Sequence, residues 1–308
     1  MTRQQNFMRM LHEDHSTAVR LAYIDFRLRF TGVVNRSDLR ETFGLAEAAA
    51  SKVLSVYNSR CPENMFYNRA VRANTILIES YRPLFSINAI TALEMLASGF
   101  DKSRLINSPV LPFSRIGHIS DLLDSENVAK ITRAMNGGYA IKCNYLSGHR
   151  HTVSERTLLP VALMYDGRFW NFRAYDRNQV DENAGFKNFS FARAVMVEEL
   201  FDAKHQRLNH EELTFDHAWN NYIPLVLQLH ENLSDEERSK IRRDFGMKDA
   251  QNELVVTQRE SELWILFKQW FIDTSDVTLD LKNDRFYKFR LINKDTVDAL
   301  ISASSANI

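Results

Sequence analysis

The 308-residue sequence predicts a multidomain α+β protein with a helical N-terminal part, a small antiparallel β-barrel and an α+β C-terminal part. Apolar residues recur at helical spacing up to about residue 60. After Gly137 and Gly138 the period changes to two, and after Phe201 strand and helix patterns alternate. We expect four segments, which cover residues 1–85, 86–122, 123–200 and 201–308.

Three helices are predicted in the N-terminal part, over residues 16–30, 36–43 and 46–60. The first two have apolar residues on one face and are followed by Gly32 and Gly44, since glycine readily adopts the left-handed conformation that ends a helix. The third is rich in good helix formers. Because only a tight turn at Gly44 separates the last two helices, we expect the third to be held outward from the surface.

Two extended stretches follow, one at Phe66 and Tyr67 and one over 75–78, and they predict a two-stranded wing. Three helices, a tight turn and a wing together form a winged helix-turn-helix domain. In such a domain the third helix enters the major groove of DNA and the wing contacts phosphates. A three-helix packing module that does not bind DNA is the alternative, and the basic residues of this surface argue against it.

Eight residues are candidates for DNA contact: Arg36, Ser51, Lys52, Ser55, Tyr67, Asn68, Arg69 and Arg72. Residues 1–85 carry 12 basic and 8 acidic side chains, a net charge of about +4, although the formal net charge of the chain is zero. The cations would bind phosphates and the serines would reach base edges, with part of the specificity left to DNA shape. A homodimer would place two third helices in successive major grooves about 34–36 Å apart, which predicts double-stranded DNA with an inverted-repeat operator as the partner.

The rest of the chain contains one linker and two further domains. A helix within 86–100 and a proline-containing stretch over 107–117 lead to a helix over 126–136, and the short strands that follow suggest a small antiparallel barrel. The order strand, helix, strand, helix over 221–272 predicts an α+β sandwich of ferredoxin-like type. We expect the apolar face of its last helix to pack in the core, with a dimer surface as the alternative.

The stretch GRFWNFRAYD, residues 167–176, predicts a strand whose two faces differ in chemistry. The tryptophan, phenylalanine and alanine at positions 170, 172 and 174 form a core face. Between them, Asn171, Arg173 and Tyr175 offer an amide, a guanidinium and a phenol on the other face. This second face carries more hydrogen-bonding groups than an ordinary solvent face needs.

Four stretches of the middle part resemble the WYL domain: NYLS, RTLLP, GRFWNFRAYD and FKNFSFARAV. Three positions depart from its pattern. Asn171 and Phe172 stand where the Trp-Tyr-Leu triplet has tyrosine and leucine, and Lys187 replaces the first arginine of a later Arg-x-Phe-x-x-x-Arg motif. With RPLF after the wing and DFGM near the end, the whole chain resembles WYL-domain regulators that accompany anti-phage systems of the BREX and CBASS kinds. The resemblance implies an Sm-like or SH3-like barrel that senses a nucleotide or nucleic-acid fragment, in a homodimeric repressor.

The candidate effector-binding residues are Tyr145, Ser147, Arg156, Asn171, Arg173, Tyr175, Lys187 and Arg193. Arginine forks bind phosphate in a bidentate manner and tyrosines stack on bases, so the set suits a nucleotide or a short single strand. The alternative is that Arg156 and Arg193 pair with acids such as Glu155, Asp176 or Glu198 and only solvate the barrel.

Other functional classes find little support in the sequence. Cys61 and Cys143 are far apart in the chain and lack metal-ligand spacing, and His12 and His15 are assigned to a frayed polar terminus, so no metal or cofactor is expected. His149 and His151 are assigned to a surface loop. No long apolar run and no nucleophile motif occurs, so we expect a cytoplasmic protein that is not an enzyme. The alternative to a repressor is an adaptor that modulates a partner enzyme without an operator of its own.

Overall fold

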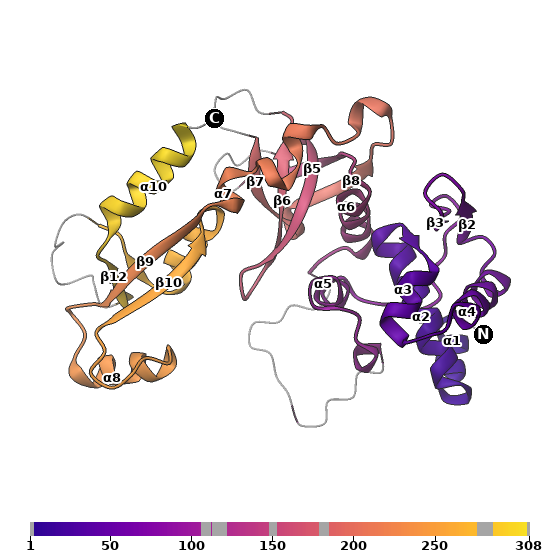
Figure 1. Ribbon diagram of the computed structural model, residues 1–308, viewed down its shortest axis with the longest axis horizontal. Helices are drawn as coiled ribbons and strands as arrows, with labels where there is room; N and C mark the ends of the chain where they lie inside the picture. Colours follow the sequence, from indigo (N-terminus) through magenta and orange to yellow (C-terminus); the bar gives the residue numbers. More distant parts are fainter. Residues whose placement is uncertain are drawn as a thin grey trace. The chain divides into compact units, whose positions relative to one another are not determined.

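The computed structural model describes residues 3–105, 112, 122–147, 153–178, 185–275 and 286–306 (Figure 1). The chain forms two compact units, Met1–Leu208 and Asn209–Ile308, and each contains its own hydrophobic core. The predicted loop histidines, His149 and His151, and nearly all of the proline-containing stretch over 107–117 lie outside the described residues. The segment boundaries within the first unit stay a prediction.

The three predicted N-terminal helices are confirmed as α2 (His15–Thr31), α3 (Arg36–Phe43) and α4 (Glu47–Arg60). Gly32 and Gly44 end α2 and α3 in the left-handed conformation, with φ angles of 79° and 64°. Their amides donate to carbonyls of the preceding helical turn, as the predicted caps require.

The assignment of the N-terminus to a frayed polar segment was wrong, because residues Arg3–Glu13 form helix α1. Phe7, Met10 and Leu11 lie on one face of it and are buried in the core of the first unit. The Phe7 ring stacks on Phe85 at a centroid distance of 5.0 Å. The spacing of these three residues is the signal that would have predicted the helix.

The wing contains one strand more than predicted. Strands β2 (Met65–Asn68) and β3 (Ala73–Ile76) form the expected antiparallel hairpin, and β1 (Val33–Val34) adds to β3 on its other side. A strand of two residues is too short to produce a detectable period. The wing therefore starts directly after the end of α2.

The core of the N-terminal domain contains a buried polar network centred on Asp25 of α2. The Tyr57 hydroxyl donates to the Asp25 carboxylate at 2.6 Å, and the Leu84 amide donates to its second oxygen at 2.9 Å. Asn64 in turn donates to the Tyr57 hydroxyl at 2.9 Å. Burial raises the pKa of the Asp25 carboxyl to about 6, although the hydrogen bond from Tyr57 opposes the rise.

The central domain is a five-stranded antiparallel sheet preceded by two helices. Its elements are α5 (Ala89–Ser98), α6 (Ser125–Gly137), β4 (Ile141–Leu146), β5 (Val153–Tyr165), β6 (Trp170–Asp176), β7 (Phe186–Ser190) and β8 (Ala194–Glu199). The strand order is β7-β6-β5-β4-β8, so the last strand returns to the first, as in a small barrel. Trp170, Phe172 and Ala174 form the predicted core face of β6.

The second unit is α+β as predicted, but its topology is not ferredoxin-like. It contains α7 (His217–Asn220), β9 (Tyr222–Leu229), α8 (Asp235–Asp244), β10 (Glu253–Arg259), α9 (Leu263–Gln269), β11 (Ile272–Asp273), β12 (Phe289–Leu291) and α10 (Lys294–Ala306). The described strands follow the order β10-β9-β12-β11, with β9 and β10 as antiparallel neighbours. A ferredoxin-like fold requires parallel strands around its first helix, so that prediction is corrected.

The rear helix α9 packs mainly as expected. Leu263 is buried and Trp270 packs against the core of the second unit. Trp264 does not, because 54% of its surface is exposed and the Lys268 ammonium lies over its ring at 5.1 Å. The apolar face is therefore narrower than the sequence indicated.

Candidate nucleic-acid interface and barrel site

Helix α4 turns its predicted reading edge outward. Lys52 and Ser55 are exposed, whereas Val53, Leu54 and Tyr57 are buried in the core. This alternation follows from the helical period, because residues three to four apart share a face. A helix with this orientation can present its polar edge to a DNA groove.

Four of the predicted DNA-contact residues line one surface hollow, which has a volume of about 260 Å³. Its lining consists of Asn35, Arg36, Ser51, Leu54, Tyr67, Arg72 and Asn74. These residues come from the start of α3, from α4 and from both strands of the wing hairpin. The structure thus brings together parts of the reading helix and the wing around one concave surface.

Sequence reasoning missed two polar residues of this hollow. Asn35 caps α3, because its side chain accepts from the Asp38 amide at 3.0 Å. Asn74 pairs with Tyr67 across the wing and donates to the Val34 carbonyl at 3.4 Å. Asn35 could have been found as an N-cap ahead of an apolar run, but no local pattern distinguishes Asn74.

The cations of this surface are available for phosphate. In the described part of the chain, Lys52, Arg69 and Arg72 are exposed and form no ion pair. Arg36 contacts Glu47 at 3.0 Å, but both side chains are more than half exposed. Such a surface pair contributes at most about 1 kcal/mol, so a phosphate can replace the carboxylate at little cost.

Arg72 has an unusual backbone conformation for its residue type. It lies at the turn of the wing with a φ of 53°, in the left-handed region that favours glycine. An arginine that is kept in this region costs about 1–2 kcal/mol relative to glycine. Backbone strain of this kind is found mainly at functional sites, and the Arg72 side chain lines the hollow.

Two further candidates are engaged in local structure. Asn68 accepts from the Ala70 amide at 3.0 Å and so shapes the wing turn. The Ser55 hydroxyl donates to the Ser51 carbonyl at 3.0 Å, which leaves only its oxygen lone pairs for a ligand. Their roles in DNA contact, like those of the other six, stay predictions.

The predicted effector face of the barrel is not one continuous surface, which corrects the expectation. Arg173 pairs with Asn188 across β6 and β7, whereas Lys187 pairs with Ala174 and therefore lies on the opposite face of the sheet from Arg173. Lys187 is nevertheless exposed, because β7 is an edge strand. Tyr145 is buried, with its ring edge-on to Phe189 at 5.0 Å. The period of two holds, but the registers between strands could not be predicted from single stretches.

Several members of the predicted effector set already have protein partners. Arg156 forms an ion pair with Asp176 at 2.8 Å, as the alternative interpretation proposed. Arg173 is only 6% exposed and donates to Asn188 at 2.9 Å. The Tyr175 ring meets Phe186 edge-on at 5.1 Å. These residues contribute to the barrel whether or not a ligand is present.

The exposed members of the set are Lys187 and Arg193, which form no ion pair among the residues that the structure describes. Arg193 ends the short 3-10 helix Phe191–Arg193, directly before β8. Ser147 and Asn171 are half-buried. The binding roles of all eight residues stay predictions.

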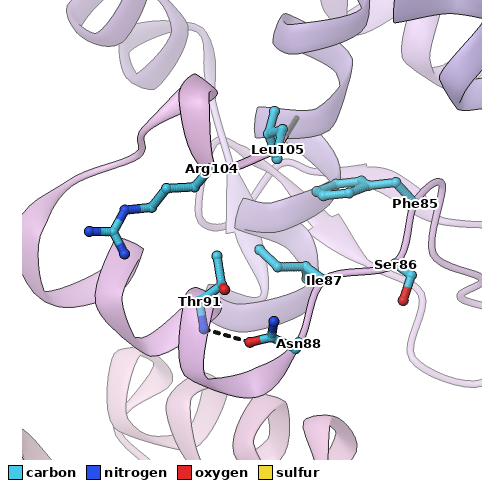
Figure 2. A pocket seen from close by; sticks show the side chains of 7 residues that line it. All are labelled: Phe85, Ser86, Ile87, Asn88, Thr91, Arg104 and Leu105. Atoms are coloured by element: carbon cyan, nitrogen blue, oxygen red, sulfur yellow. Dashed lines mark hydrogen bonds between the residues drawn. The ribbon is translucent and has the colours of Figure 1, made fainter. Parts of the chain in front are cut away.

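A smaller pocket, of about 70 Å³, lies at the start of α5 and contains none of the predicted site residues (Figure 2). Its polar groups are used within the fold, because Asn88 caps α5 by accepting from the Thr91 amide at 2.8 Å. Arg104 extends away from Phe85 in Figure 2 and pairs with Glu94. This pocket therefore offers no free charge to a ligand.

Neither a metal site nor a membrane span is found in the described ranges. No three His, Cys, Asp or Glu side chains there gather closely enough to hold a metal ion. None of the helices there is long and apolar enough to cross a bilayer.

Comparison with known families identifies three domains in the predicted order. The winged helix-turn-helix domain of BrxR transcriptional regulators matches residues 16–96, and the WYL domain matches residues 126–195. The C-terminal dimerization domain of BrxR transcriptional regulators matches residues 222–297. The predicted resemblance to WYL-domain regulators is confirmed.

Individual relatives are also DNA-binding transcriptional regulators. The DNA-binding transcriptional repressor CapW of Escherichia coli (strain KTE188) is 27% identical over 287 residues, which are 92% of this chain and 91% of that protein. CapW of Stenotrophomonas maltophilia is 30% identical over 243 residues, which are 76% of this chain and 77% of that protein. With this identity over three quarters of both proteins and the three domains in order, the chain belongs to the family of CapW DNA-binding transcriptional repressors.

Proposed function

We propose that this protein represses transcription of a phage-defence operon by binding an inverted-repeat operator as a homodimer. Helix α4 enters the major groove, and the β2–β3 wing lies along the flanking phosphates. The protein acts by binding DNA and not by catalysis, and it does so in the cytoplasm. Family membership supports the repressor role, and the resemblance to regulators of anti-phage systems supports a defence operon as the target.

The observation that carries this proposal is the hollow between α3, α4 and the wing. It joins the cations of Arg36 and Arg72 to the polar edge of Ser51 and the exposed ring of Tyr67. Cations on either side of a reading helix position the protein on the backbone, and short polar side chains between them reach base edges.

The homodimer is supported by the match of residues 222–297 to a dimerization domain. Two-fold symmetry of the protein would be mirrored by the two half-sites of the operator.

We further propose that the barrel binds an anionic effector, a nucleotide or a short single strand. The exposed cations Lys187 and Arg193, which form no ion pair in the described residues, support this ligand class. The buried or paired state of Tyr145, Arg156 and Arg173 limits the contacts that a ligand can make without rearrangement.

Replacement of Lys52 by alanine should weaken operator binding about 3- to 10-fold per protomer and reduce the salt slope of log K by about two, because each protomer of the dimer loses one phosphate contact. Fluorescence anisotropy with an inverted repeat from upstream of the gene, at several salt concentrations, measures both quantities. Lys240→Ala, which removes an exposed lysine of α8 in the second unit, is the matched control. Equal binding of the operator and of random duplex by the wild type would favour the adaptor instead.

Replacement of Arg72 by glycine should separate stability from DNA binding. Glycine accepts a φ of 53° without strain but loses more chain entropy on folding, which offsets about 0.5–1 kcal/mol of the relief. The N-terminal domain should therefore keep its stability or gain up to about 1 kcal/mol. Operator affinity should nevertheless fall about tenfold, because the guanidinium is lost. Thermal unfolding and anisotropy are the two measurements, and Arg72→Lys, which keeps the charge, should lose less affinity. Unchanged affinity in the glycine variant would exclude Arg72 from the interface.

Replacement of Arg193 by glutamine should abolish binding of the effector without affecting binding of operator DNA by the unliganded protein. Titration calorimetry of the wild type with cyclic oligonucleotides and short single-stranded DNA identifies which class binds. Glu155→Gln, which changes an exposed acid of the same barrel, is the control. Absence of heat with all of these ligands would support a barrel whose charges only solvate it.

A further inference from the structure

Helix α6 contacts both the N-terminal domain and the barrel. One face packs against α2, and another packs against β8, the last barrel strand (Figure 1). It is held to β8 by two backbone contacts at Val197, whose carbonyl accepts from Lys130 at 2.8 Å and whose amide donates to Asn127 at 3.3 Å. A displacement of β8 would therefore act directly on α6.

Arg133 of α6 bridges the two domains through its guanidinium. Its Nε and Nη2 atoms donate to the two carboxylate oxygens of Glu199 at 2.9 Å and 2.6 Å. Its Nη1 atom donates to the Arg29 carbonyl in the last turn of α2 at 2.8 Å. The Glu199 carboxylate also accepts from the Tyr139 hydroxyl at 2.7 Å. The Arg133 and Glu199 side chains are only 5% and 4% exposed.

This arrangement caps the C-terminal end of α2. The last carbonyls of a helix have no partner within it, and they carry partial negative charge that a cation stabilises. Arg133 satisfies the Arg29 carbonyl, and Asn136 donates to the Thr31 carbonyl at 2.9 Å. Both caps come from α6 and not from the chain that follows α2.

The capped end is also the start of the wing. Gly32 follows α2, its carbonyl accepts from the Ile76 amide of β3 at 2.9 Å, and β1 begins at the next residue. The aliphatic part of the Arg133 side chain lies over Gly32. Arg133 therefore contacts the chain where α2 ends, where the wing begins and where the turn toward α3 starts.

On the barrel side, the bridge starts from a strand with an irregular backbone. The pairing of β8 with β4 shifts register between Lys142 and Asn144, and Met196 opposite this shift has a φ of 53° and is 77% exposed. Arg193, a predicted effector residue, lies immediately before the strand. A ligand held at this point would act on the same strand that holds Glu199.

We propose that Arg133 is the positioning residue that couples the barrel to DNA binding, through its simultaneous bonds to Glu199 and to the end of α2. The intact bridge holds the reading helix and wing in the orientation that the operator requires. A barrel state that withdraws Glu199 releases the end of α2 and lowers operator affinity. This inference rests on the proposed function and adds to it the route by which the barrel acts.

The chemistry of the bridge explains why an arginine is needed. A planar guanidinium donates to both carboxylate oxygens and to a carbonyl on another side at once, from three separate nitrogen atoms. The three donors of a lysine ammonium all lie on one nitrogen atom and do not match a carboxylate in this bidentate way. The pair is also buried, so its loss leaves an uncompensated charge in the interior and is not simply replaced by water.

The test compares the full-length wild type with Arg133→Lys, Glu199→Gln and the double variant, by anisotropy on operator and on random duplex. Each single variant should lose at least tenfold in operator affinity, and the double variant should lose little more, since both changes break one bridge. Affinity for random duplex and the salt slope should stay unchanged, because no phosphate contact is removed. Glu155→Gln, which breaks the exposed pair with Lys142 at 2.8 Å, should change nothing.

Hydrogen exchange of the same proteins supplies a second readout. The variants should exchange faster at the end of α2 and in β3, with α4 and β6 as protected as in the wild type. Tyr139→Phe, which removes one donor to Glu199 and keeps the ion pair, should show the same pattern with a loss of about 2- to 3-fold in operator affinity. It keeps the test decisive should a charge variant fail to fold.

Faster exchange at the end of α2 with unchanged operator affinity would overturn the proposal, as would additive losses in the double variant or an equal loss on random duplex. A wild type that shows no operator preference would refute the proposed function instead. In that case the exchange of β3 in Glu199→Gln still decides whether the barrel and the wing are coupled.

Discussion

A chain that ends at Leu208 is expected to bind an inverted-repeat operator about 10²- to 10⁴-fold more weakly than the full chain. The cause is the loss of the second half-site, which a dimer binds at high effective concentration. The removed unit contains its own core, built around Ile223, Leu225, Leu227 and Phe289, and the core of the first unit, as far as the structure describes it, includes none of its residues. The shortened chain should therefore fold but stay monomeric.

Light scattering and anisotropy on the shortened chain measure these two effects separately. The salt slope should fall to about half, because half of the phosphate contacts remain. A version of the shortened chain joined to a leucine zipper is the control, and it should recover part of the lost affinity. A shortened chain that is still a dimer would place the dimer contacts in the first unit and contradict the prediction.

The helices of the N-terminal domain could be predicted because their signals are local. Gly32 and Gly44 end α2 and α3 where the sequence placed them, since a left-handed residue is needed there and glycine provides it. Helix α1 was missed because its polar residues outnumber Phe7, Met10 and Leu11, although these three have helical spacing. The third wing strand has two residues, and pairing with β3 defines it more than its own sequence does.

The candidate sites depend on pairings that single stretches do not contain. The sequence predicted DNA contacts for Arg36 and Arg72 from their charge and for Tyr67 from its position in the wing. Only the folded arrangement of α3, α4 and the paired strands β2 and β3 shows that the three residues line one hollow. In the barrel, Arg156 meets Asp176 from a neighbouring strand. Strand register decides such contacts, and a shift of one residue would turn each side chain to the opposite face.

The topology of the C-terminal sheet could not be predicted from single stretches of sequence either. An order of strand, helix, strand and helix fits several sheets, and the ferredoxin-like arrangement was the wrong choice. Helix α8 connects β9 to an antiparallel neighbour, and β12 lies on the other side of β9. Nothing in the β9 sequence distinguishes these neighbours, because its buried leucines face the same core in either arrangement.

Replacement of Tyr57 by phenylalanine should destabilise the N-terminal domain by about 1 kcal/mol at pH 4.5 and by about 1.5–3 kcal/mol at pH 7.5. Asp25 has a folded pKa of about 6, above its ordinary value of 3.8, so its carboxyl favours folding most when protonated. That contribution is complete below about pH 4 and is lost as the pH rises through 6, by about 3 kcal/mol in total. The Tyr57 hydroxyl, at 2.6 Å, limits this loss because it donates to the charged form.

The dependence on pH identifies the cause of the destabilisation. Without the hydroxyl the pKa of Asp25 rises further, so the difference between variant and wild type grows only where Asp25 ionises. Protection factors of α2 and α4 amides from hydrogen exchange, corrected for intrinsic rates, measure this domain, which contains none of the four tryptophans of the chain. Tyr67→Phe, at a 57% exposed wing residue, should be neutral at both pH values. An equal loss at pH 4.5 and 7.5 would mean that Asp25 keeps one protonation state throughout, and that the network contributes only neutral hydrogen bonds.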